Sequence, residues 1–398
     1  MTFQISEFRL HHFQAMITVP EIIFTVTNDL TYDQRMLRIC STMADAGYKV
    51  TLVGRLLPGS VPLDVRNFEQ TRLKCRYNKG KFFYLEYNWR LYEYLLNHVK
   101  KAKNSSRLAL CAIDLDTIMP VLQASRRMKT RRLYDAHELF TELTEVKRRP
   151  IIAAIWNWVE RQAVPNFKFG YTVNEFIAGE LNKRYGINYA VIRNLPFRRK
   201  TEIDKNKLKL PPGKFFLYQG AVNEGRCFET LIPAMKLVNA NLVIAGEGNF
   251  YQQAKELTAL HQVTAKVFFL GNVKPAQLAS LTPLAYAGIT LFENSGLNQY
   301  YSLANRYFDY IQGGIPQLCV DYPEYEALNQ QYPTALLIHD LSAESIAQNL
   351  NKLLEDAVFY NELKRQCETA GKMLCWEIEA IKLKAYWDHV LPLNNTGE

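Results

Sequence analysis

Residues 291–320 read LFENSGLNQYYSLANRYFDYIQGGIPQLCV. The pattern predicts a strand end, a polar loop, a helix from about Ala304 to Gln312, and a Gly-Gly-Ile-Pro turn into another strand. A loop that leads into a helix N-terminus can bind an anion, because free backbone N–H groups and the helix dipole both point toward it. This stretch therefore predicts an α/β unit with an anion site at one end of its sheet.

Three side chains of this predicted helix suit a nucleotide. Arg306 places a positive charge in the first turn, and Asp309 follows three residues after Arg306 and four after Asn305. Residues at these spacings can share one helix face. Backbone amides and a guanidinium suit a diphosphate, and a carboxylate suits the two hydroxyls of a ribose. The combination predicts a nucleotide-sugar site.

The same rhythm of strand and helix runs along the whole chain, which is typical of βαβ units and parallel sheets. The predicted strands of the first half are residues 21–28, 49–55, 108–114, 131–137, 169–174 and 190–196. Those of the second half are residues 214–220, 241–248, 266–272, 287–293, 316–321 and 335–340. Between the halves, residues 197–213 (FRRKTEIDKNKLKLPPG) are polar and basic and end in Pro-Pro-Gly, so we interpret them as a linker.

The length and composition of the chain narrow the classes of protein to which it can belong. A chain of 398 residues suits two or three domains, and it has no run of 18 apolar residues that would predict a membrane span. No signal peptide is visible, and the first twenty residues are either an extension or a stretch before a true start at Met16. The seven scattered cysteines contain no CxxC pair, and metal-ligand spacing is absent, which favours a reduced, cytoplasmic chain without a metal site.

Charge is unevenly distributed. Residues 1–196 carry a net charge of +11 and the remainder −2, which gives the +9 of the whole chain. This asymmetry predicts an acidic partner for the first half.

The segment SLANRYFDYIQGGIP (302–316) resembles the SLPNKxFEYMAxGxP segment of glycosyltransferase family 4 enzymes, which have the GT-B fold. The resemblance extends along nearly the whole chain, and it is closest to a bacterial subgroup whose first strand ends in N-D-x-x-x-D-x-R, here residues 28–35. It implies two doubly wound Rossmann-like α/β domains that face a central cleft, with ligands outside the carboxyl ends of the strands. The implied parts are an acceptor-binding domain (1–196), a donor-binding domain (214–375) and a helix (376–391) that packs back on the first domain.

Residues 218–226 (YQGAVNEGR) resemble the family's GRLxxxKG loop. There the strand-end glycine, here Gly220, lets a phosphate approach the backbone, and Arg226 takes the second basic position. Ala221 occupies the first basic position, so we expect Arg306 to supply the missing charge. The alternative is that Arg226 is a solvated loop cation. Two further turns resemble family loops near the ribose and base, and they add Gly246, Glu247 and Asn272 to the expected donor site.

The loop before the predicted helix departs from the family pattern. Family members usually carry two glutamates separated by seven residues, and these positions hold Tyr301 and Asp309 here. Tyrosine supplies no carboxylate, so Glu293 on the preceding strand end is a candidate replacement. The loop is expected to offer backbone N–H groups and the Ser302 hydroxyl to the phosphates; an irregular connection without a ligand is the alternative. The expected donor residues of this segment are Asn298, Tyr301, Ser302, Leu303 and Asn305.

In the first half, His137 ends a predicted strand and resembles the family histidine that contacts the transferred sugar, although a lone strand-end histidine is more often structural. Asn28 and Asp29 follow the first strand, where they either bind acceptor hydroxyls or cap the next helix. Tyr87 and Asn88 are expected on the acceptor side.

Residues 147–158 (KRRPIIAAIWNW) combine a basic cluster with an apolar, Trp-bearing helix. The pattern suits peripheral contact with an anionic membrane, because basic residues meet anionic lipid and Trp lies at the headgroup level. An ordinary buried helix with a solvated cap is the alternative. A second basic cluster is compatible with an acidic glycan or a lipid phosphate and comprises Arg126, Arg127, Lys129, Arg131 and Arg132.

The resemblance implies a retaining, metal-independent glycosyltransferase of hexosyltransferase type. It would move a sugar from a nucleotide diphosphate-sugar to a hydroxyl of a glycan or lipid-linked acceptor, without a cofactor, in cell-surface polysaccharide or lipopolysaccharide synthesis. The expected catalytic residues are His137, Arg226, Arg306 and Asp309. The expected location is the cytoplasm, with peripheral contact at the inner face of the membrane. The alternatives are a GT-B nucleotide-sugar 2-epimerase, which needs no acceptor, and a non-catalytic basic module, for which no nucleic-acid motif is found.

Overall fold

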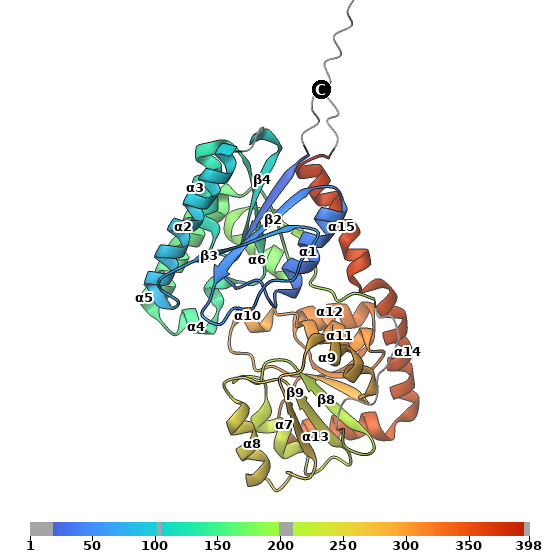
Figure 1. Cartoon of the computed structure of the whole chain (residues 1–398). Coiled ribbons are helices and arrows are strands. Elements are labelled where there is room, and N and C mark those ends of the chain that lie inside the picture. Colours follow the sequence, from blue (N-terminus) through green and yellow to red (C-terminus); the bar gives the residue numbers. More distant parts are fainter. Residues whose placement is uncertain (1–18, 102–104, 199–209, 394–398) are drawn as a thin grey trace, which may run out of the picture.

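The structure is a computed structural model, and it describes residues 19–101, 105–198 and 210–393. Two α/β domains lie one above the other in Figure 1, with the N-terminal domain at the top. The middle of the predicted linker, residues 199–209, and the question of a start at Met16 lie outside the described residues. Across the described ranges, no helix is both long and apolar enough to cross a bilayer.

The N-terminal sheet has seven parallel strands in the order β3-β2-β1-β4-β5-β6-β7. Its inner strands are almost entirely buried, as expected for a parallel sheet that is covered by helices on both faces. The strands are β1 (Glu21–Thr25), β2 (Lys49–Leu56), β3 (Glu69–Lys74), β4 (Leu108–Ile113), β5 (Arg131–Ala136), β6 (Phe169–Thr172) and β7 (Ala190–Val191).

The helices of this domain connect successive strands. Its α-helices are α1 (Gln34–Asp45), α2 (Gly80–Lys101), α3 (Ile118–Met128), α4 (Thr144–Lys147), α5 (Pro150–Ala163) and α6 (Glu175–Tyr185). Three short 3-10 turns are η1 (Ser105–Arg107), η2 (Phe140–Glu142) and η3 (Val164–Asn166).

The C-terminal sheet has six parallel strands in the order β10-β9-β8-β11-β12-β13. The strands are β8 (Phe215–Gln219), β9 (Asn241–Ala245), β10 (Val267–Gly271), β11 (Ala287–Thr290), β12 (Gln317–Val320) and β13 (Ala335–Ile338). The helical segments are α7 (Phe228–Ala234), α8 (Tyr251–Leu260), α9 (Pro275–Leu281), η5 (Thr282–Leu284), α10 (Leu297–Tyr300), α11 (Asn305–Gln312), α12 (Pro323–Gln331), α13 (Ala343–Glu355) and α14 (Ala357–Met373).

Both sheets reverse their strand order at one place, between β1 and β4 in the first domain and between β8 and β11 in the second. The loops that leave such neighbouring strands diverge to opposite faces of the sheet and open a crevice at the carboxyl ends. The segments after β1 and β4 and those after β8 and β11 therefore form the floor of any site that this fold offers.

The last helix, α15 (Trp376–Val390), lies against the N-terminal sheet. The ring of Trp387 packs edge-on against Phe24 of β1, with 5.5 Å between centroids. The indole Nε1 of Trp376 donates a hydrogen bond to Thr42 Oγ1 at 2.9 Å. Figure 1 shows this helix running up the side of the upper domain. The chain thus crosses twice between the domains, near residue 196 and near residue 375.

The predicted α/β fold class is confirmed, and each of the twelve predicted strands has a counterpart in the two sheets. The sequence did not predict β3, the edge strand EQTRLK, because its polar side chains lack the apolar alternation of a half-buried strand. The helix expected from about Ala304 to Gln312 is α11, and Ala304 is its N-cap residue.

Candidate active site in the interdomain cleft

Three adjoining cavities lie in the cleft between the domains. The first is bounded by His137 and Glu138 from the upper domain and by Arg226 and Arg306 from the lower one. The second shares His137 with the first cavity and Asn305 with the third. The third is bounded by α1, α9, α11 and the segment near residue 196. A long ligand could therefore lie along the whole cleft.

Two guanidinium groups meet in the first cavity without a carboxylate partner. The Cζ atoms of Arg226 and Arg306 lie 4.5 and 5.0 Å from the ring centroid of Phe292, and that of Arg306 lies 4.3 Å from the ring of Tyr218. Within residues 19–101, 105–198 and 210–393, neither arginine forms an ion pair, and Arg306 Nη1 is buried without a hydrogen-bond partner. Burial, followed by the neighbouring charge of Arg306, lowers the pKa of Arg226. An anion between the two groups would satisfy both.

The N-terminus of α11 adds to this positive potential. Its N-cap residue, Ala304, has no capping side chain, and Ser302 and Leu303 line the same cavity. The first N–H groups of a helix lack intrahelical partners, so they are free to bind an anion. Gly220, at the end of β8, lies beside Arg306, because a Cβ atom placed on it would sit 3.8 Å from Arg306 Cζ. These features bring the predicted residues Gly220, Arg226, Ser302, Leu303 and Arg306 together.

Asp309 faces a different part of the cleft from Arg306. Its carboxylate accepts a hydrogen bond from Gln219 Nε2 at 3.0 Å and lines the third cavity, together with Asn305. Burial raises the pKa of Asp309 to about 6, opposed by the Gln219 hydrogen bond and the charge of Arg38. The three residues predicted to share one helix face are thus spread along the cleft, with Arg306 and Asp309 on either side of the end of β8.

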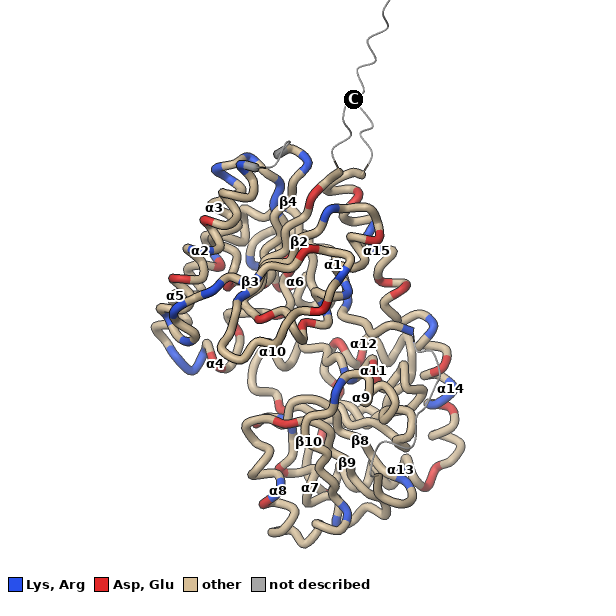
Figure 2. Tube along the Cα trace, viewed as in Figure 1, with Lys and Arg blue, Asp and Glu red and all other residues tan. Residues whose placement is uncertain are grey.

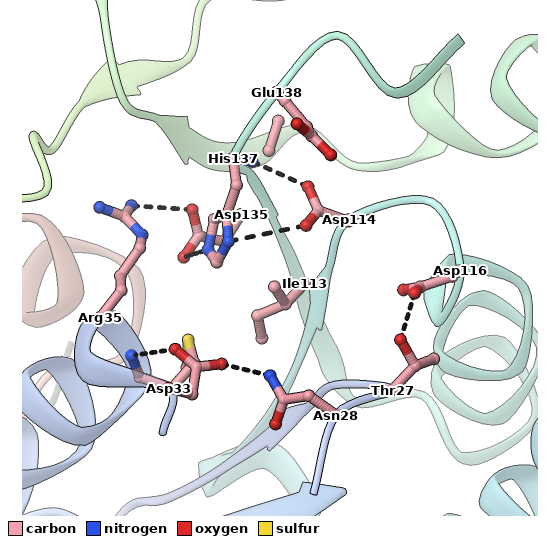
Figure 3. Close-up of polar contacts among 12 residues, drawn as sticks. Thr27, Asn28, Asp33, Arg35, Ile113, Asp114, Asp116, Asp135, His137 and Glu138 are labelled. Carbon is pink, nitrogen blue, oxygen red and sulfur yellow. Dashed lines mark hydrogen bonds and ion pairs between the residues drawn. The ribbon is translucent and has the colours of Figure 1, made fainter. Parts of the chain in front are cut away.

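Alternating charges form a chain at the carboxyl end of the N-terminal sheet (Figure 3). The guanidinium of Arg35 donates to Asp135 Oδ1 at 2.9 Å, and Asp135 Oδ2 lies 3.0 Å from His137 Nε2. Asp114 Oδ1 accepts from the backbone N–H of His137 at 2.9 Å, and its Oδ2 lies 3.6 Å from His137 Nδ1. Asp135 and His137 are two residues apart at the end of β5, so their side chains emerge on the same face. Both ring nitrogens of His137 therefore face carboxylates.

This environment fixes the charge of His137. Burial lowers the pKa of His137, but the charge of Asp135, followed by that of Asp114, outweighs this effect and raises it to about 9. Burial also raises the pKa of Asp114, to about 8, so Asp135 is the partner that is ionised at neutral pH. Burial also raises the pKa of Asp135, but Arg35 and His137 bring it below its usual value. At neutral pH the imidazole is mostly a cation. It can donate a hydrogen bond or stabilise negative charge in the cleft, and it is poorly suited to accept a proton.

Two carboxylates after β4 were missed by the sequence analysis. Asp114 holds His137 as described, and Asp116 accepts a hydrogen bond from Thr27 Oγ1 after β1. Burial raises the pKa of Asp116 to about 6, opposed by the Thr27 hydrogen bond. Their position directly after a buried apolar strand was the available signal, because strand ends at a switch point gather functional side chains.

Three residues predicted for the donor site, in and around α10, either lie outside the first cavity or make contacts with the upper domain. Glu293 is exposed and does not line the first cavity, so the structure does not place it as the replacement for the first family glutamate. The ring of Tyr301 stacks on Phe176 of the upper domain at 5.3 Å between centroids. Asn298 lines the first cavity, but its Oδ1 accepts from the backbone N–H of Leu139 at 3.1 Å, which joins the two domains.

The first of the two glycine-containing turns has a structural explanation. A Cβ atom on Gly246 would lie 1.9 Å from the carbonyl oxygen of Gly220, so these two loops pack backbone to backbone. Glu247 and Asn272 are exposed and outside the three cavities. None of these predicted donor residues therefore contacts the cavity of the two arginines, although Gly246 permits the course of the Gly220 loop.

The four residues predicted for the acceptor side have structural contacts within the N-terminal domain. The side chains of Asn28 and Asp29 stabilise their own loop: Asn28 Nδ2 donates to Asp33 Oδ2 at 2.6 Å, and Asp29 accepts from Thr31. Neither caps α1, because Asp33 is the N-cap and accepts from the N–H of Met36. Tyr87 is fully buried, with its hydroxyl on the backbone of Val26, so it belongs to the core. Asn88 donates to the backbone of Asp116 at 3.0 Å and supports that loop.

Comparisons with known proteins identify the fold. Residues 199–373 match the family described as glycosyl transferases group 1. Among solved structures, sucrose-phosphate synthase from Thermosynechococcus elongatus superposes with a TM-score of 0.77 at 14% identity, over 94% of this chain and all of that one. Anabaena Alr3699/HepE in complex with UDP and glucose superposes with 0.69 at 10% identity, over 94% and 99% of the chains. WaaG, a glycosyltransferase of lipopolysaccharide biosynthesis, superposes with 0.62 at 14%, over 94% and 100%.

No curated protein sequence matches the chain significantly. The structural matches confirm the predicted GT-B fold. The match of residues 199–373 to the glycosyl transferases group 1 family confirms the predicted enzyme class, a glycosyltransferase.

Proposed function

We propose that this protein transfers a sugar from a nucleotide diphosphate-sugar to a hydroxyl of a glycan or lipid-linked acceptor, with retention of anomeric configuration and without a metal. The observation that carries the proposal is the pair Arg226 and Arg306, two buried or half-buried guanidinium groups without a carboxylate partner among the described residues. Family 4 and its bacterial subgroup remain predictions from the sequence.

A diphosphate fits this pair better than other anions do. Its charge is spread over several oxygens, so it can bind two guanidinium groups and the N-terminus of α11 at once. The third cavity, which begins beside Gln219 and Asp309, offers a carboxylate for the ribose hydroxyls on the far side of β8. We therefore place the nucleoside in the third cavity and the diphosphate in the first.

The same groups explain how the reaction would proceed. As the bond from the sugar to the diphosphate breaks, negative charge grows on the departing phosphate, and Arg226 and Arg306 stabilise it. In a front-face substitution, an oxygen of that phosphate takes the proton of the acceptor hydroxyl. His137, which lines the same cavity as a cation, contacts the transferred sugar as a hydrogen-bond donor. Cleft closure excludes water and limits donor hydrolysis.

The acceptor and the location are finer parts of the proposal. The acceptor approaches from the N-terminal domain, whose surplus of positive charge suits an acidic glycan or a phosphate-bearing lipid. HepE with UDP and WaaG of lipopolysaccharide biosynthesis, two proteins of similar fold, support a nucleotide-sugar donor and a cell-surface polymer. We place the reaction at the cytoplasmic side of the membrane.

A thermal-shift series with UDP, GDP, ADP, CMP and dTDP tests the donor site, since a ligand that binds only the folded chain raises its melting temperature. We expect one nucleoside diphosphate to raise it equally with and without EDTA, and the shift to disappear in Arg226→Ala. The corresponding donor sugar is then incubated with acceptor candidates. Release of an altered sugar nucleotide without acceptor would identify an epimerase instead, and no shift with any nucleotide would refute the donor site.

A further inference from the structure

Two neighbouring helices of the N-terminal domain expose large apolar side chains to solvent. On α5 these are Ile151, Ile155 and Trp158, which are 78%, 54% and 57% exposed and lie at spacings of four and three residues. The sequence left open whether this helix is buried. The structure places its outer side in solvent, so the alternative of an ordinary buried helix is wrong.

The second helix, α2, was not suspected from the sequence. It exposes Phe82, Leu85 and Trp89, which are 54%, 68% and 64% accessible and occupy spacings of three and four residues. The two helices touch where the ring of Tyr84 meets that of Trp156 edge-on, with 5.4 Å between centroids. Six large apolar side chains on adjoining helices exceed what scattered surface hydrophobics account for.

Exposed basic residues border this apolar surface. Arg148 and Arg149 precede α5, and Arg161 lies in its last turn. Lys79 and Lys81 stand at the start of α2. Figure 2 shows Lys and Arg gathered around α4 and α5 at the lower end of the N-terminal domain. Lys147 is paired with Glu142, and Glu145 offsets one of the remaining charges, so the border keeps a positive excess.

The surface is close to the cleft. Phe140 of η2 packs on Trp156 of α5 with 4.8 Å between centroids, and only two residues separate Phe140 from His137 in the first cavity. The carbonyl of Glu142, also in η2, faces Gly296 of the lower domain. A flat amphiphilic surface bound here would therefore lie at the edge of the proposed active site.

We infer that the apolar face of α2 and α5, with its basic border, docks on an anionic lipid bilayer. Trp and branched apolar side chains enter the headgroup boundary while Lys and Arg pair with lipid phosphates, which is the chemistry of an interfacial amphipathic surface. A second copy of the chain would meet the same positive charge on the other side of the interface, so charge complementarity favours anionic lipid. The inference stands on exposure and charge, and it is independent of the transferase proposal.

The test is flotation of the full-length chain with vesicles of phosphatidylcholine alone and of phosphatidylcholine with 30% phosphatidylglycerol. We expect binding to the anionic vesicles that weakens with salt. The double variant Ile155→Ser/Trp158→Ser should lose at least about tenfold in affinity, because its apolar area no longer inserts. The double variant Arg148→Ser/Arg149→Ser should lose about fivefold for each charge.

Matched controls are Leu260→Ser and Val358→Ser, which remove equally exposed apolar side chains, 72% and 83% accessible, from the lower domain. They should bind vesicles like the wild type, and all variants should melt at the wild-type temperature because the changed side chains lie outside the core. Equal binding by the Ile155/Trp158 variant, equal binding to both vesicle types, or a Trp158-dependent dimer without vesicle binding would each overturn the inference.

Discussion

Asp135 Oδ2 lies 3.0 Å from His137 Nε2, inside a site where the aspartate is completely buried. The other oxygen of the same carboxylate accepts from Arg35 at 2.9 Å (Figure 3). A buried anion between two cations sets both the charge and the orientation of the histidine that faces the cleft. This pairing gives the N-D-x-x-x-D-x-R segment (28–35) a physical role. Its arginine is Arg35, and its second aspartate, Asp33, caps α1, the helix that carries Arg35.

The first prediction concerns this pairing. In Asp135→Asn, the pKa of His137 should fall from about 9 toward the ordinary histidine value, because its main attractive charge is gone. The unpaired Arg35 should reduce the free energy of unfolding by about 3–5 kcal/mol. Histidine NMR titration and urea denaturation measure the two effects. Asp321→Asn is the matched control: its partner His339 is 92% exposed, so it should change stability by less than about 1 kcal/mol.

His137 should also make stability depend on pH. Its folded pKa of about 9 lies above the unfolded value near 6.5, so its stabilisation is complete below pH 6.5 and is lost as pH rises to about 9. The loss should be on the order of 3 kcal/mol at 1.36 kcal/mol per pKa unit. Between pH 6 and 10, the free energy of unfolding should fall for the wild type and should change less for His137→Gln. The same pH dependence in both proteins would show that His137 is not held as a cation.

The arginine pair predicts phosphate-dependent binding. Arg226→Ala should weaken the affinity for a nucleoside diphosphate about 10- to 100-fold, as expected from the loss of charge-assisted hydrogen bonds worth about 1.5–3 kcal/mol. The affinity for the corresponding nucleoside should not change, because that part lies near Asp309. Calorimetry with both ligands measures the difference. Lys255→Ala, which removes a cation that lies over the ring of Tyr251, is the control. Equal losses for nucleoside and diphosphate would contradict the assignment.

Asp309 should distinguish ribose from deoxyribose. Its pKa of about 6 means that the carboxylate is ionised above pH 6 and becomes a weaker acceptor as pH falls below it. The preference for a ribonucleotide over its 2′-deoxy analogue should therefore be lost on acidification through pH 6. In Asp309→Asn that preference should be small at every pH, at a cost of about tenfold in ribonucleotide affinity. A pH-independent preference in the wild type would place the ribose elsewhere.

The sequence predicted the repeating parts of the fold well, because apolar strand runs and βα alternation are local signals. It predicted the helix at 304–312 and the residues that flank it for the same reason. It placed Tyr87 on the acceptor side, whereas the structure buries it, because a helix periodicity leaves the inward face undetermined until a neighbouring sheet is present. The edge strand β3 was not predicted, because its side chains are mostly polar.

The candidate site was predictable only where recognisable sequence motifs carry it. Arg226, Arg306 and Ser302 come together through two adjacent strand ends, as the resemblance of their segments to family motifs predicted. The charge chain could not be predicted, because Arg35, Asp114 and Asp135 meet only through the order of β1, β4 and β5 in the sheet. Asn298 was expected in the donor site, and it does line the first cavity. Its hydrogen bond to Leu139, which joins the domains, was not predicted, because it depends on how the two halves pack.

Gly246 shows how a turn outside the cavities still governs the site. Its φ of +149° and the 1.9 Å that would separate a Cβ atom from the Gly220 carbonyl oxygen leave no room for alanine. Gly246→Ala should lower the free energy of unfolding by at least about 3 kcal/mol. It should also weaken diphosphate binding, because the Gly220 loop must move beside Arg306. Gly59 has a φ of +84°, but no atom lies within 4 Å of a Cβ atom added to it. Gly59→Ala should therefore lower the free energy of unfolding by only about 1–2 kcal/mol and leave binding unchanged. Urea denaturation with calorimetry separates the two variants, and equal costs would show that backbone conformation, and not the contact with Gly220, makes glycine necessary at residue 246.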